Sequence, residues 1–409
     1  MTNCHRPELV VTGIGVISAV GQGKSAFASA LMQGHHAFDV MKRPGRQRDT
    51  AFLGAEIASL PSARRLSKRT LRTTSLSGQV AVAALEEAWD EAGLEEVDPG
   101  RVGLVIGGSN IQQRELVLTQ EHYRNRPSYV RPTYGFTFLD SDLYGLCTEL
   151  FGIKGYGLTV GAASASGQLA VLQACQAILA GQVDVCIALG ALMDLSYWEF
   201  QALRSMGAMG SDRYGQAPAS ACRPFDSSRD GFIYGESCGA IVIERARPGG
   251  RAGVKLYATL AGWAMRMDGN RNPNPSYEGE VWVIEEALRH AGLAAGDIDY
   301  VNPHGTGSVI GDKTELAAIR DCGLSHAYIN TTKSIVGHGL SAAGVVEVIA
   351  TLLQMEARQL HPSRNLDDPI DRSFNWVKGD CQSHAIQHAL KLSMGFGGTN
   401  TALCVSAMR

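Results

Sequence analysis

The sequence lacks the features that mark several large classes of protein. No basic run is long enough to suggest nucleic acid or an anionic membrane as a partner, and the formal net charge of −3 shows no strong bias. The N-terminal residues do not combine a basic segment with a long apolar one, and no stretch of about 20 apolar residues occurs. We therefore expect a soluble, cytoplasmic protein that binds neither nucleic acid nor membrane.

Cysteine pairs and metal-ligand spacings are also missing. The nine cysteines are an odd number, they are scattered from Cys4 to Cys404, and none forms a C-x-x-C pair, so we expect buried free thiols. No H-E-x-x-H or other compact ligand spacing is present, which argues against a structural or catalytic metal. The sequence therefore predicts no metal site.

What is present is the pattern of a layered α/β protein. Hydrophobic residues make up 45% and charged residues 19% of the 409 residues, an ordinary globular balance. Apolar, β-branched strands alternate with helical stretches. Thr74 to Ala92 has helical spacing, with Gly93 placed to end the helix. Strands are predicted at residues 9–16, 102–108, 183–191, 240–244 and 255–263.

A joint between two halves is predicted near residue 250. The run RARPGGRA at 245–252 is dense in proline, glycine and arginine, and it lies between two predicted strands. We therefore divide the chain into residues 1–250 and 251–409 and expect a duplicated fold. Residues 112–141 show no clear period, which suggests a long excursion over the surface or at a subunit interface. Residues 268–280 are expected to shape a pocket mouth or an interface.

A candidate nucleophile stands at a predicted strand-to-helix junction. In GLTVGAASASGQLAVLQ, a strand ends in small residues and a helix begins at about Ser164. Free backbone N–H groups and the positive end of the helix dipole stabilise negative charge that develops at such a position. The position suits an acyl-transfer nucleophile, and it equally suits an ordinary serine N-cap.

Two histidines emerge from glycine-bracketed loops. His304 lies in VNPHGTGSVIGDKTE, and His338 lies in a glycine-rich turn before a long apolar helix. Glycines there let the chain approach a ligand closely, so both imidazoles could donate hydrogen bonds to one substrate oxygen. Lys333 and Glu347, which flank His338 in the sequence, either hold the imidazoles in place or simply form a buried ion pair.

Two other glycine-containing motifs each have two possible interpretations. GFGGTN near the C-terminus is either a tight hairpin or a turn whose N–H groups bind an anion while Phe396 gates an acyl pocket. GESCG at 235–239 matches the G-x-S-x-G pattern of α/β-hydrolases, which would make Ser237 the nucleophile. That pattern requires a helix after the serine, and here a predicted strand follows. We therefore reject the hydrolase alternative.

Five segments occur in order over nearly the whole chain: VVTGIGVIS, RPFDSSRDGFIYGE, HGTGSVIGDKTE, TKSIVGHGLSAAGVVE and GFGGTN. Together they resemble the β-ketoacyl-acyl-carrier-protein synthases, which include the type II elongating enzymes and polyketide ketosynthases. The resemblance implies an α/β thiolase fold, with five α-β-α-β-α layers built from two similar halves. It also implies a homodimer and an acyl carrier protein as partner.

The resemblance further implies the residues of a site. A Cys-His-His triad maps onto Ser164, His304 and His338, with Lys333 as a further catalytic position. The main-chain N–H groups of Ser164 and Phe396 would form an oxyanion hole. No cofactor is implied, because phosphopantetheine arrives on the carrier protein. The remaining implied positions contact the substrate, at Thr306, Ser308, Met394 and Phe396, or support the site from behind, at Glu347 and Asp312.

The sequence departs from the family pattern at three positions. The family has Thr-Ala-Cys-x-Ser-Gly where this chain has AASASG at 162–167, so Ser164 replaces the cysteine nucleophile. Met394 stands where the family usually has the first phenylalanine of its glycine-rich turn, and Val309 replaces a usual proline. The last two changes would reshape the pocket without removing chemistry.

The serine changes the expected reaction. Loading an acyl chain relies on thiolate chemistry, because a serine hydroxyl needs a dedicated base. Decarboxylation of malonyl carrier protein instead needs donors at the thioester oxygen, where both histidines remain. We therefore predict a malonyl-carrier-protein decarboxylase that releases acetyl carrier protein, similar to the serine-variant ketosynthases of polyketide β-branching cassettes.

Two other functions stay open. In the first, Ser164 is acylated with a histidine as its base, as in an acyltransferase or a residual condensing enzyme. In the second, the chain is a non-catalytic partner like the chain-length subunits that pair with an active ketosynthase. Such subunits commonly lose the histidines too, so the retention of His304, His338 and Lys333 argues against this role.

Overall fold

The computed structural model describes residues 8–246, 251 and 253–408. The main strands of its first half are β1 (Leu9–Ser18), β5 (Val102–Gly107), β6 (Gly157–Val160), β7 (Val185–Gly190) and β9 (Ser237–Arg245). Those of its second half are β10 (Ala258–Met267), β11 (Tyr300–Asn302), β12 (Tyr328–Ile329), β14 (Asn375–Trp376), β16 (His388–Gly395) and β17 (Thr399–Ala407).

The two halves repeat one strand arrangement. The first has the order β6-β5-β7-β9-β1, and the second has β12-β11-β16-β17-β10 with β14 added at its edge. In both, the first two neighbouring pairs are parallel and the next two are antiparallel. They join where Val10 of β1 pairs with Thr259 of β10. The expectation of a duplicated α/β fold is therefore confirmed.

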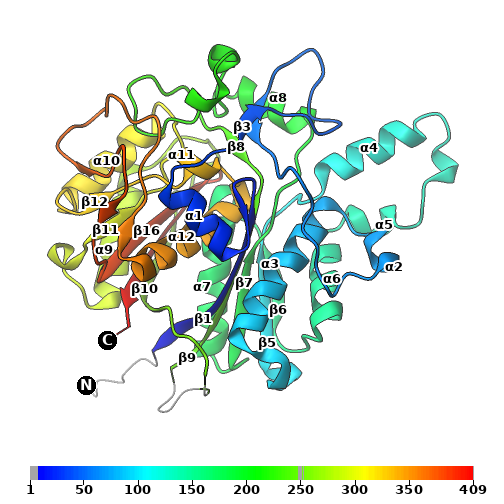
Figure 1. Cartoon of the computed structure of the whole chain (residues 1–409), viewed down its shortest axis with the longest axis horizontal. Coiled ribbons are helices and arrows are strands. Elements are labelled where there is room, and N and C mark those ends of the chain that lie inside the picture. Colours follow the sequence, from blue (N-terminus) through cyan, green and yellow to red (C-terminus); the bar gives the residue numbers. More distant parts are fainter. Residues whose placement is uncertain (1–7, 247–250, 252, 409) are drawn as a thin grey trace.

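Helices cover both faces of each set of strands (Figure 1). The helices α7 (Ser166–Leu179) and α12 (Ala343–Ala357) lie between the two sets, and their side chains share one buried cluster with both. The helix α3 (Leu76–Ala92) packs on the outer face of the first set, while α9 (Tyr277–Ala291) and α10 (Gly311–Asp321) pack on that of the second. The result is the five-layered α-β-α-β-α arrangement expected of the thiolase fold.

Shorter elements complete the described chain. The remaining strands are β2 (Gly21–Gln22), β3 (Phe38–Val40), β4 (Leu53–Ala55), β8 (Tyr234–Gly235), β13 (Gln359–Leu360) and β15 (Gln382–Ser383). The remaining α-helices are α1 (Lys24–Met32), α2 (Lys68–Leu71), α4 (Gln113–Tyr123), α5 (Tyr134–Thr137), α6 (Ser141–Phe151), α8 (Tyr197–Ser205) and α11 (Lys333–Val336).

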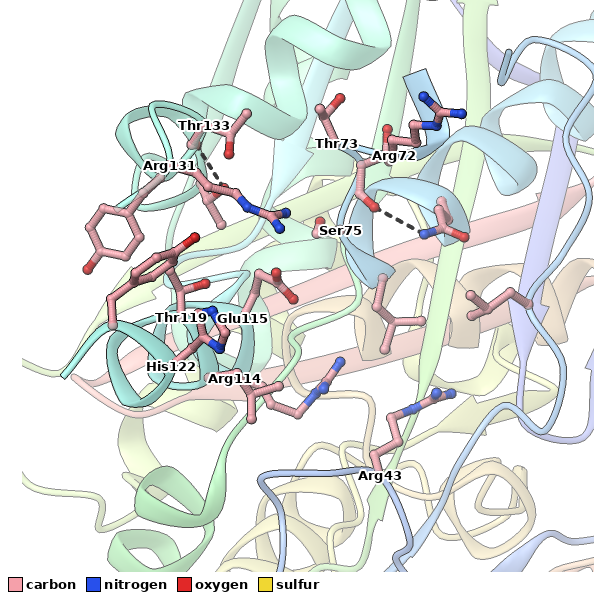
Figure 2. Close-up of a pocket in the computed structure, with 18 residues that line it drawn as sticks. Arg43, Arg72, Thr73, Ser75, Arg114, Glu115, Thr119, His122, Arg131 and Thr133 are labelled. Atoms are coloured by element: carbon pink, nitrogen blue, oxygen red, sulfur yellow. Dashed lines mark hydrogen bonds between the residues drawn. The ribbon is translucent and has the colours of Figure 1, made fainter. Parts of the chain in front are cut away.

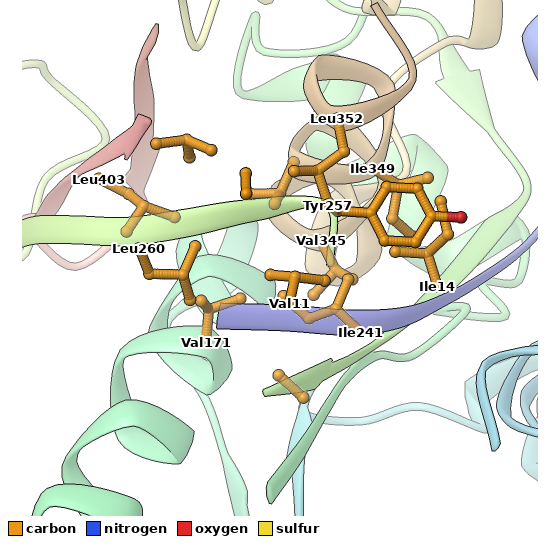
Figure 3. Close-up of a cluster of buried hydrophobic side chains, with 14 of the residues drawn as sticks. Val11, Ile14, Val171, Ile241, Tyr257, Leu260, Val345, Ile349, Leu352 and Leu403 are labelled. Atoms are coloured by element: carbon orange, nitrogen blue, oxygen red, sulfur yellow. The ribbon is translucent and has the colours of Figure 1, made fainter. Parts of the chain in front are cut away.

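The central layer is buried on all sides. Figure 3 shows Val11 of β1, Val171 of α7, Val345 of α12 and Leu403 of β17 meeting in one apolar cluster. Within the described ranges, Leu340–Ala357 alone is long and apolar enough to cross a membrane, and 83% of it is buried inside the protein. A helix that is apolar all round belongs in a core when its neighbours cover it. We therefore assign α12 as the central core helix.

Two glycines let α7 and α12 approach closely at their N-terminal ends. A side-chain carbon at Gly167 would lie 2.7 Å from the carbonyl oxygen of Ser341. A side-chain carbon at Gly344 would meet the main-chain nitrogen of Gln168 well inside 3.0 Å, closer than such atoms approach in proteins. Since neither contact involves a flexible side chain, only glycine allows this separation of the helices.

Most local expectations from the sequence are confirmed. All five predicted strands are present, and α3 begins two residues later than predicted because the Ser75 side chain caps it by accepting from the Gly78 N–H at 3.2 Å. Gly93 ends α3 in the left-handed conformation, with φ 58°. None of the eight cysteines of the described ranges forms a disulfide, and six of them are buried. The boundary near residue 250 falls outside the described residues and stays a prediction.

The excursion at 112–141 is helical rather than irregular. It contains α4 and α5 and projects from the body of the molecule (Figure 1). A cavity of about 500 Å³ lies between it and the residues that precede α3, with Arg43, Arg72, Arg114 and Arg131 in its lining (Figure 2). Arg43 and Arg114 are neutralised by buried carboxylates. Because α4 and α5 project from the body of the molecule, the predicted surface position of residues 112–141 is confirmed.

The contact between α7 and α12 gives a stability test. Gly344→Ala should lower the free energy of unfolding by about 1–3 kcal/mol, because the added methyl group overpacks against a main chain that cannot rotate away. Gly145→Ala in α6 is the control, since a side-chain carbon there meets no atom within 4 Å and alanine favours helix by about 0.5–1 kcal/mol. Urea unfolding followed by circular dichroism measures both. Equal midpoints for the two variants would contradict the close approach.

Candidate active site

Ser164 lies in a short 3-10 turn, Ala163–Ala165, between β6 and α7. Ala163 adopts a left-handed conformation with φ 46°, which an L-residue takes at a cost of about 1–2 kcal/mol. The turn places Ser164 Oγ 2.9 Å from His338 Nε2. No side chain caps α7, so the N-cap alternative for Ser164 is wrong. The hydroxyl is therefore directed at the imidazole rather than at its own helix.

His338 carries its proton on the nitrogen that faces Ser164. Its Nδ1 accepts a hydrogen bond from the Leu340 N–H at 3.3 Å, which leaves Nε2 as the protonated nitrogen of a neutral imidazole. Burial lowers the pKa of His338 well below its ordinary value, and the positive charges of Lys333 and Lys391 lower it further. His338 is therefore a hydrogen-bond donor to Ser164 and not a base for it.

His304 joins this pair from the second half of the chain. It follows β11, and its ring lies 5.6 Å from the His338 ring, centroid to centroid, at an interplanar angle of 83°. Burial lowers the pKa of His304 well below its ordinary value, and Lys333 and His338 add to the effect. The site thus presents two neutral imidazoles side by side.

Glu315 of α10 holds the loop that carries His304. One of its carboxylate oxygens accepts from the His304 N–H at 2.5 Å, and the other accepts from the Gly305 N–H at 2.8 Å. Burial raises the pKa of Glu315 to about 7. Glu315 was not predicted from the sequence, although its spacing from Asp312 places both residues on one face of a helix.

Lys333 and Glu347 form a buried ion pair that also fixes the His304 loop. Lys333 Nζ lies 2.5 Å from Glu347 Oε1 and donates to the main-chain oxygen of His304. Lys333 and Glu347 therefore form the buried ion pair that the sequence suggested. Lys333 also helps to position His304, but through the main chain of His304 and not through its imidazole. Lys333 and Glu347 do not line the cavity that Ser164 shares with the two histidines.

Lys391 is a second buried ammonium on the same carboxylate. Its Nζ lies 2.8 Å from Glu347 Oε2, and its side chain is fully buried. Burial and the charge of Lys333 lower the pKa of Lys391 to about 8, although Glu347 acts in the opposite direction. Lys391 was not predicted from the sequence, although a lysine inside the apolar strand β16 indicates a paired buried charge. One carboxylate thus faces two lysines behind the imidazoles.

Asp312 supports the site one step further away. Its carboxylate accepts from the Phe225 N–H at 2.7 Å and the Gly307 N–H at 3.1 Å, and Arg229 lies 3.4 Å from it. Burial raises the pKa of Asp312 to about 6. The side chain therefore ties two loops together and does not touch an imidazole.

Ser164, His304 and His338 open into one cavity of about 410 Å³. The residues predicted to contact substrate all line it: Thr306, Ser308, Met394 and Phe396. Its apolar wall is formed by Met193, Leu195, Leu203, Met206, Phe232 and Leu340. Residues 272–275 also line it, together with Asp268 and Glu280, so the segment 268–280 does shape the pocket.

The glycine-rich turn joins β16 to β17 as a hairpin and forms a wall of the same cavity. Gly395 packs against the carbonyl oxygen of Ala162, where a side-chain carbon would collide. This contact brings Phe396 next to the turn that carries Ser164. Ser237, by contrast, is buried at the start of β9, and a strand follows it, so the rejection of the hydrolase pattern is confirmed.

The buried charges predict an order of damage. Glu347→Gln leaves two buried ammonium groups without a carboxylate and should cost about 3–5 kcal/mol, whereas Lys391→Met leaves the Lys333–Glu347 pair intact and should cost less. Urea unfolding of the two variants at pH 7 measures this difference. A Lys391→Met protein as unstable as Glu347→Gln would contradict the assignment of Glu347 as the shared counter-charge.

Comparisons with known proteins identify the family of this chain. Models of the beta-ketoacyl synthase N-terminal and C-terminal domains match residues 6–248 and 257–367. A relative from Bacillus subtilis (strain 168), named polyketide biosynthesis malonyl-ACP decarboxylase PksF, is 62% identical over 405 residues, covering 99% of this chain and 98% of the relative.

Solved structures share the whole fold. A beta-ketoacyl synthase from Burkholderia phymatum STM815 matches with a TM-score of 0.88 at 26% identity, covering 98% of this chain and 100% of that one. AntDE:AntF, a type II PKS acyl-carrier protein in complex with its ketosynthase bound to the hexaketide, matches with a TM-score of 0.86 at 25% identity, covering 99% and 100%. The chain therefore belongs to the beta-ketoacyl synthase family.

Proposed function

We propose that this protein decarboxylates malonyl-acyl-carrier-protein to acetyl-acyl-carrier-protein in polyketide biosynthesis. One observation carries the proposal: Ser164 stands where the family has its nucleophilic cysteine. The Ser164 hydroxyl accepts a hydrogen bond from His338 and does not donate its proton to that ring. The 62% identity to a relative named as a malonyl-ACP decarboxylase supports the same reaction.

The two imidazoles act as donors to the thioester oxygen of the malonyl group. The bond between the methylene carbon and the carboxylate breaks, and carbon dioxide leaves. The electron pair of that bond stays with the methylene carbon and is delocalised onto the thioester oxygen, which gives an enolate. His304 and His338 are both neutral at pH 7, so each can present an N–H to the developing charge. Such preorganised donors stabilise a transition state far more than they stabilise the substrate.

Acylation of Ser164 is disfavoured by the same geometry. A serine hydroxyl becomes a nucleophile only when a neighbouring base accepts its proton. The His338 nitrogen nearest to Ser164 already holds a proton, and Nδ1 is occupied by the Leu340 N–H. His338 therefore does not act as a base for Ser164, which argues against the acyltransferase and condensing alternatives.

The carrier protein brings the phosphopantetheine arm with the substrate, so the mechanism uses no separate cofactor. Thr306 and Ser308 lie in the cavity lining, where they are proposed to contact this arm. The main-chain N–H groups of Ser164 and Phe396 are proposed as an oxyanion hole, and Met394 as part of the acyl pocket. A cytoplasmic homodimer is the proposed working form.

The histidines give the first test of the decarboxylase. His304→Ala and His338→Ala should each lower the rate of acetyl carrier protein formation by about 10²–10³-fold, because each removes one donor to the enolate oxygen. Mass spectrometry of malonyl carrier protein incubated with each variant measures this rate. His326→Ala, which changes an exposed histidine outside the cavity, is the matched control and should retain the wild-type rate. Full activity in either cavity variant would remove the two-donor mechanism.

Restoring the family's cysteine gives a second test. Ser164→Cys should accumulate a covalent acyl-enzyme when incubated with an acyl carrier protein, because a thiol supplies its own thiolate fraction where the hydroxyl needs a base. Intact-protein mass spectrometry detects the adduct. Wild type and Ser164→Ala should show none, and a stable acyl ester on the wild-type serine would favour the acyltransferase alternative.

A further inference from the structure

The proposed reaction leaves a proton unaccounted for. Loss of carbon dioxide from a malonyl thioester produces an enolate, and release of an acetyl thioester then requires a proton on the former methylene carbon. In a condensing reaction that carbon attacks an acyl group instead. The inference below rests on the proposed decarboxylation and concerns the group that supplies this proton.

The histidines and lysines of the site are poorly placed to supply it. Both imidazoles are neutral, and a neutral imidazole N–H donates a hydrogen bond but is a weak acid. Lys333 is engaged by Glu347 and the His304 carbonyl, and Lys391 by Glu347. A carboxylic acid in the cavity wall would be a stronger proton donor.

Four of the five carboxyl groups that line the cavity already accept hydrogen bonds. Glu199 accepts from the Ser196 N–H at 2.9 Å, and Asp268 accepts from the Asn400 side chain at 2.6 Å. Both oxygens of Glu315 accept main-chain N–H groups, and so do both oxygens of Asp312. Glu280 differs, because its Oε2 is buried and has no hydrogen-bond partner within the described structure.

Glu280 stands in the first turn of α9, and its side chain is almost fully buried, with 1% of the residue exposed. The ionisable groups that act on it come from two neighbouring elements: Asp268, which follows β10, and Glu315 of α10. From β17, the neutral Asn400 completes the surroundings by bonding Asp268. Since Glu315 also bonds the His304 N–H, Glu280 belongs to the His304 side of the cavity.

The surroundings of Glu280 favour its protonated form. Burial raises its pKa well above the ordinary value, and the negative charges of Glu315 and Asp268 raise it further. No cation offsets these effects among the groups that act on it. The side chain therefore keeps a proton at a pH where an exposed glutamate has lost its own, with an unpartnered oxygen in the wall of the reaction cavity.

We propose that Glu280 is the general acid that protonates the methylene carbon of the enolate. The proton leaves the Glu280 carboxyl group, a C–H bond forms, and the enolate electron pair closes to the thioester carbonyl of acetyl carrier protein. The Glu280 carboxylate then regains a proton from water. One malonyl thioester and one proton thus give one acetyl thioester and one carbon dioxide.

Glu280→Gln tests this role with little change in shape. The variant should form acetyl carrier protein about 10²-fold more slowly, the low end of the range for general acid catalysis. In wild type, kcat should fall as the pH rises through the Glu280 pKa, because the acid form is lost, and this fall should vanish in the variant. In an equal mixture of H2O and D2O, the deuterium fraction of the acetyl methyl group should also change, since another donor delivers the proton.

The controls separate this role from folding and from the reaction itself. Glu280→Gln replaces a buried carboxyl group that has an unpartnered oxygen, so it should unfold at a temperature no lower than wild type. Glu278→Gln alters an exposed carboxylate in the same turn and should leave rate, pH profile and deuterium fraction unchanged. A Glu280→Gln protein that matches wild type in all three would overturn the inference and leave the decarboxylase standing. A wild-type protein that releases no carbon dioxide from malonyl carrier protein would overturn both.

Discussion

The close approach of α7 and α12 is the constraint on which the site depends. Gly167 and Gly344 let the two helices meet main chain to main chain, and the residues just before them, Ser164 and His338, therefore meet as well. One helix comes from each half of the duplicated fold. The reacting groups thus lie where the halves join, and neither half contains a site of its own. The layers around this contact act mainly to hold the two helix ends in register.

Buried charge sets the chemistry of that junction. Burial lowers the pKa of both histidines, and the positive charges of Lys333 and Lys391 lower it further, so both rings stay neutral and able to donate. Burial also drives Glu280 and Glu315, which line the same cavity, toward their protonated forms. The cavity wall therefore combines donors that do not give up protons with an acid that can. A malonyl thioester needs the donors first, while carbon dioxide leaves, and the acid afterwards, when the enolate is protonated.

Much of this arrangement was predictable from the sequence because strands and glycine-bracketed loops leave local patterns in it. Apolar runs of strand length gave the strands, and the glycine-bracketed loops indicated His304 and His338. Lys391 and Glu280 could not be found in this way. Each lies in an otherwise ordinary strand or helix. Lys391 is unusual because the fold pairs it with Glu347, and Glu280 because the fold leaves its Oε2 without a hydrogen-bond partner. The resemblance to ketosynthases located the nucleophile position, but the hydrogen-bond direction at Ser164 required the Leu340 N–H, which only coordinates reveal.

The pair of lysines on Glu347 has one more consequence. Some charged sites in proteins obtain their positive charge from cations that they bind from solution, and their electrostatic field then depends on the concentration of those cations. Here both cations are part of the polypeptide and are shut away from solvent. The electric field that the imidazoles experience is therefore set by the polypeptide, and it depends only weakly on the salt concentration of the solution.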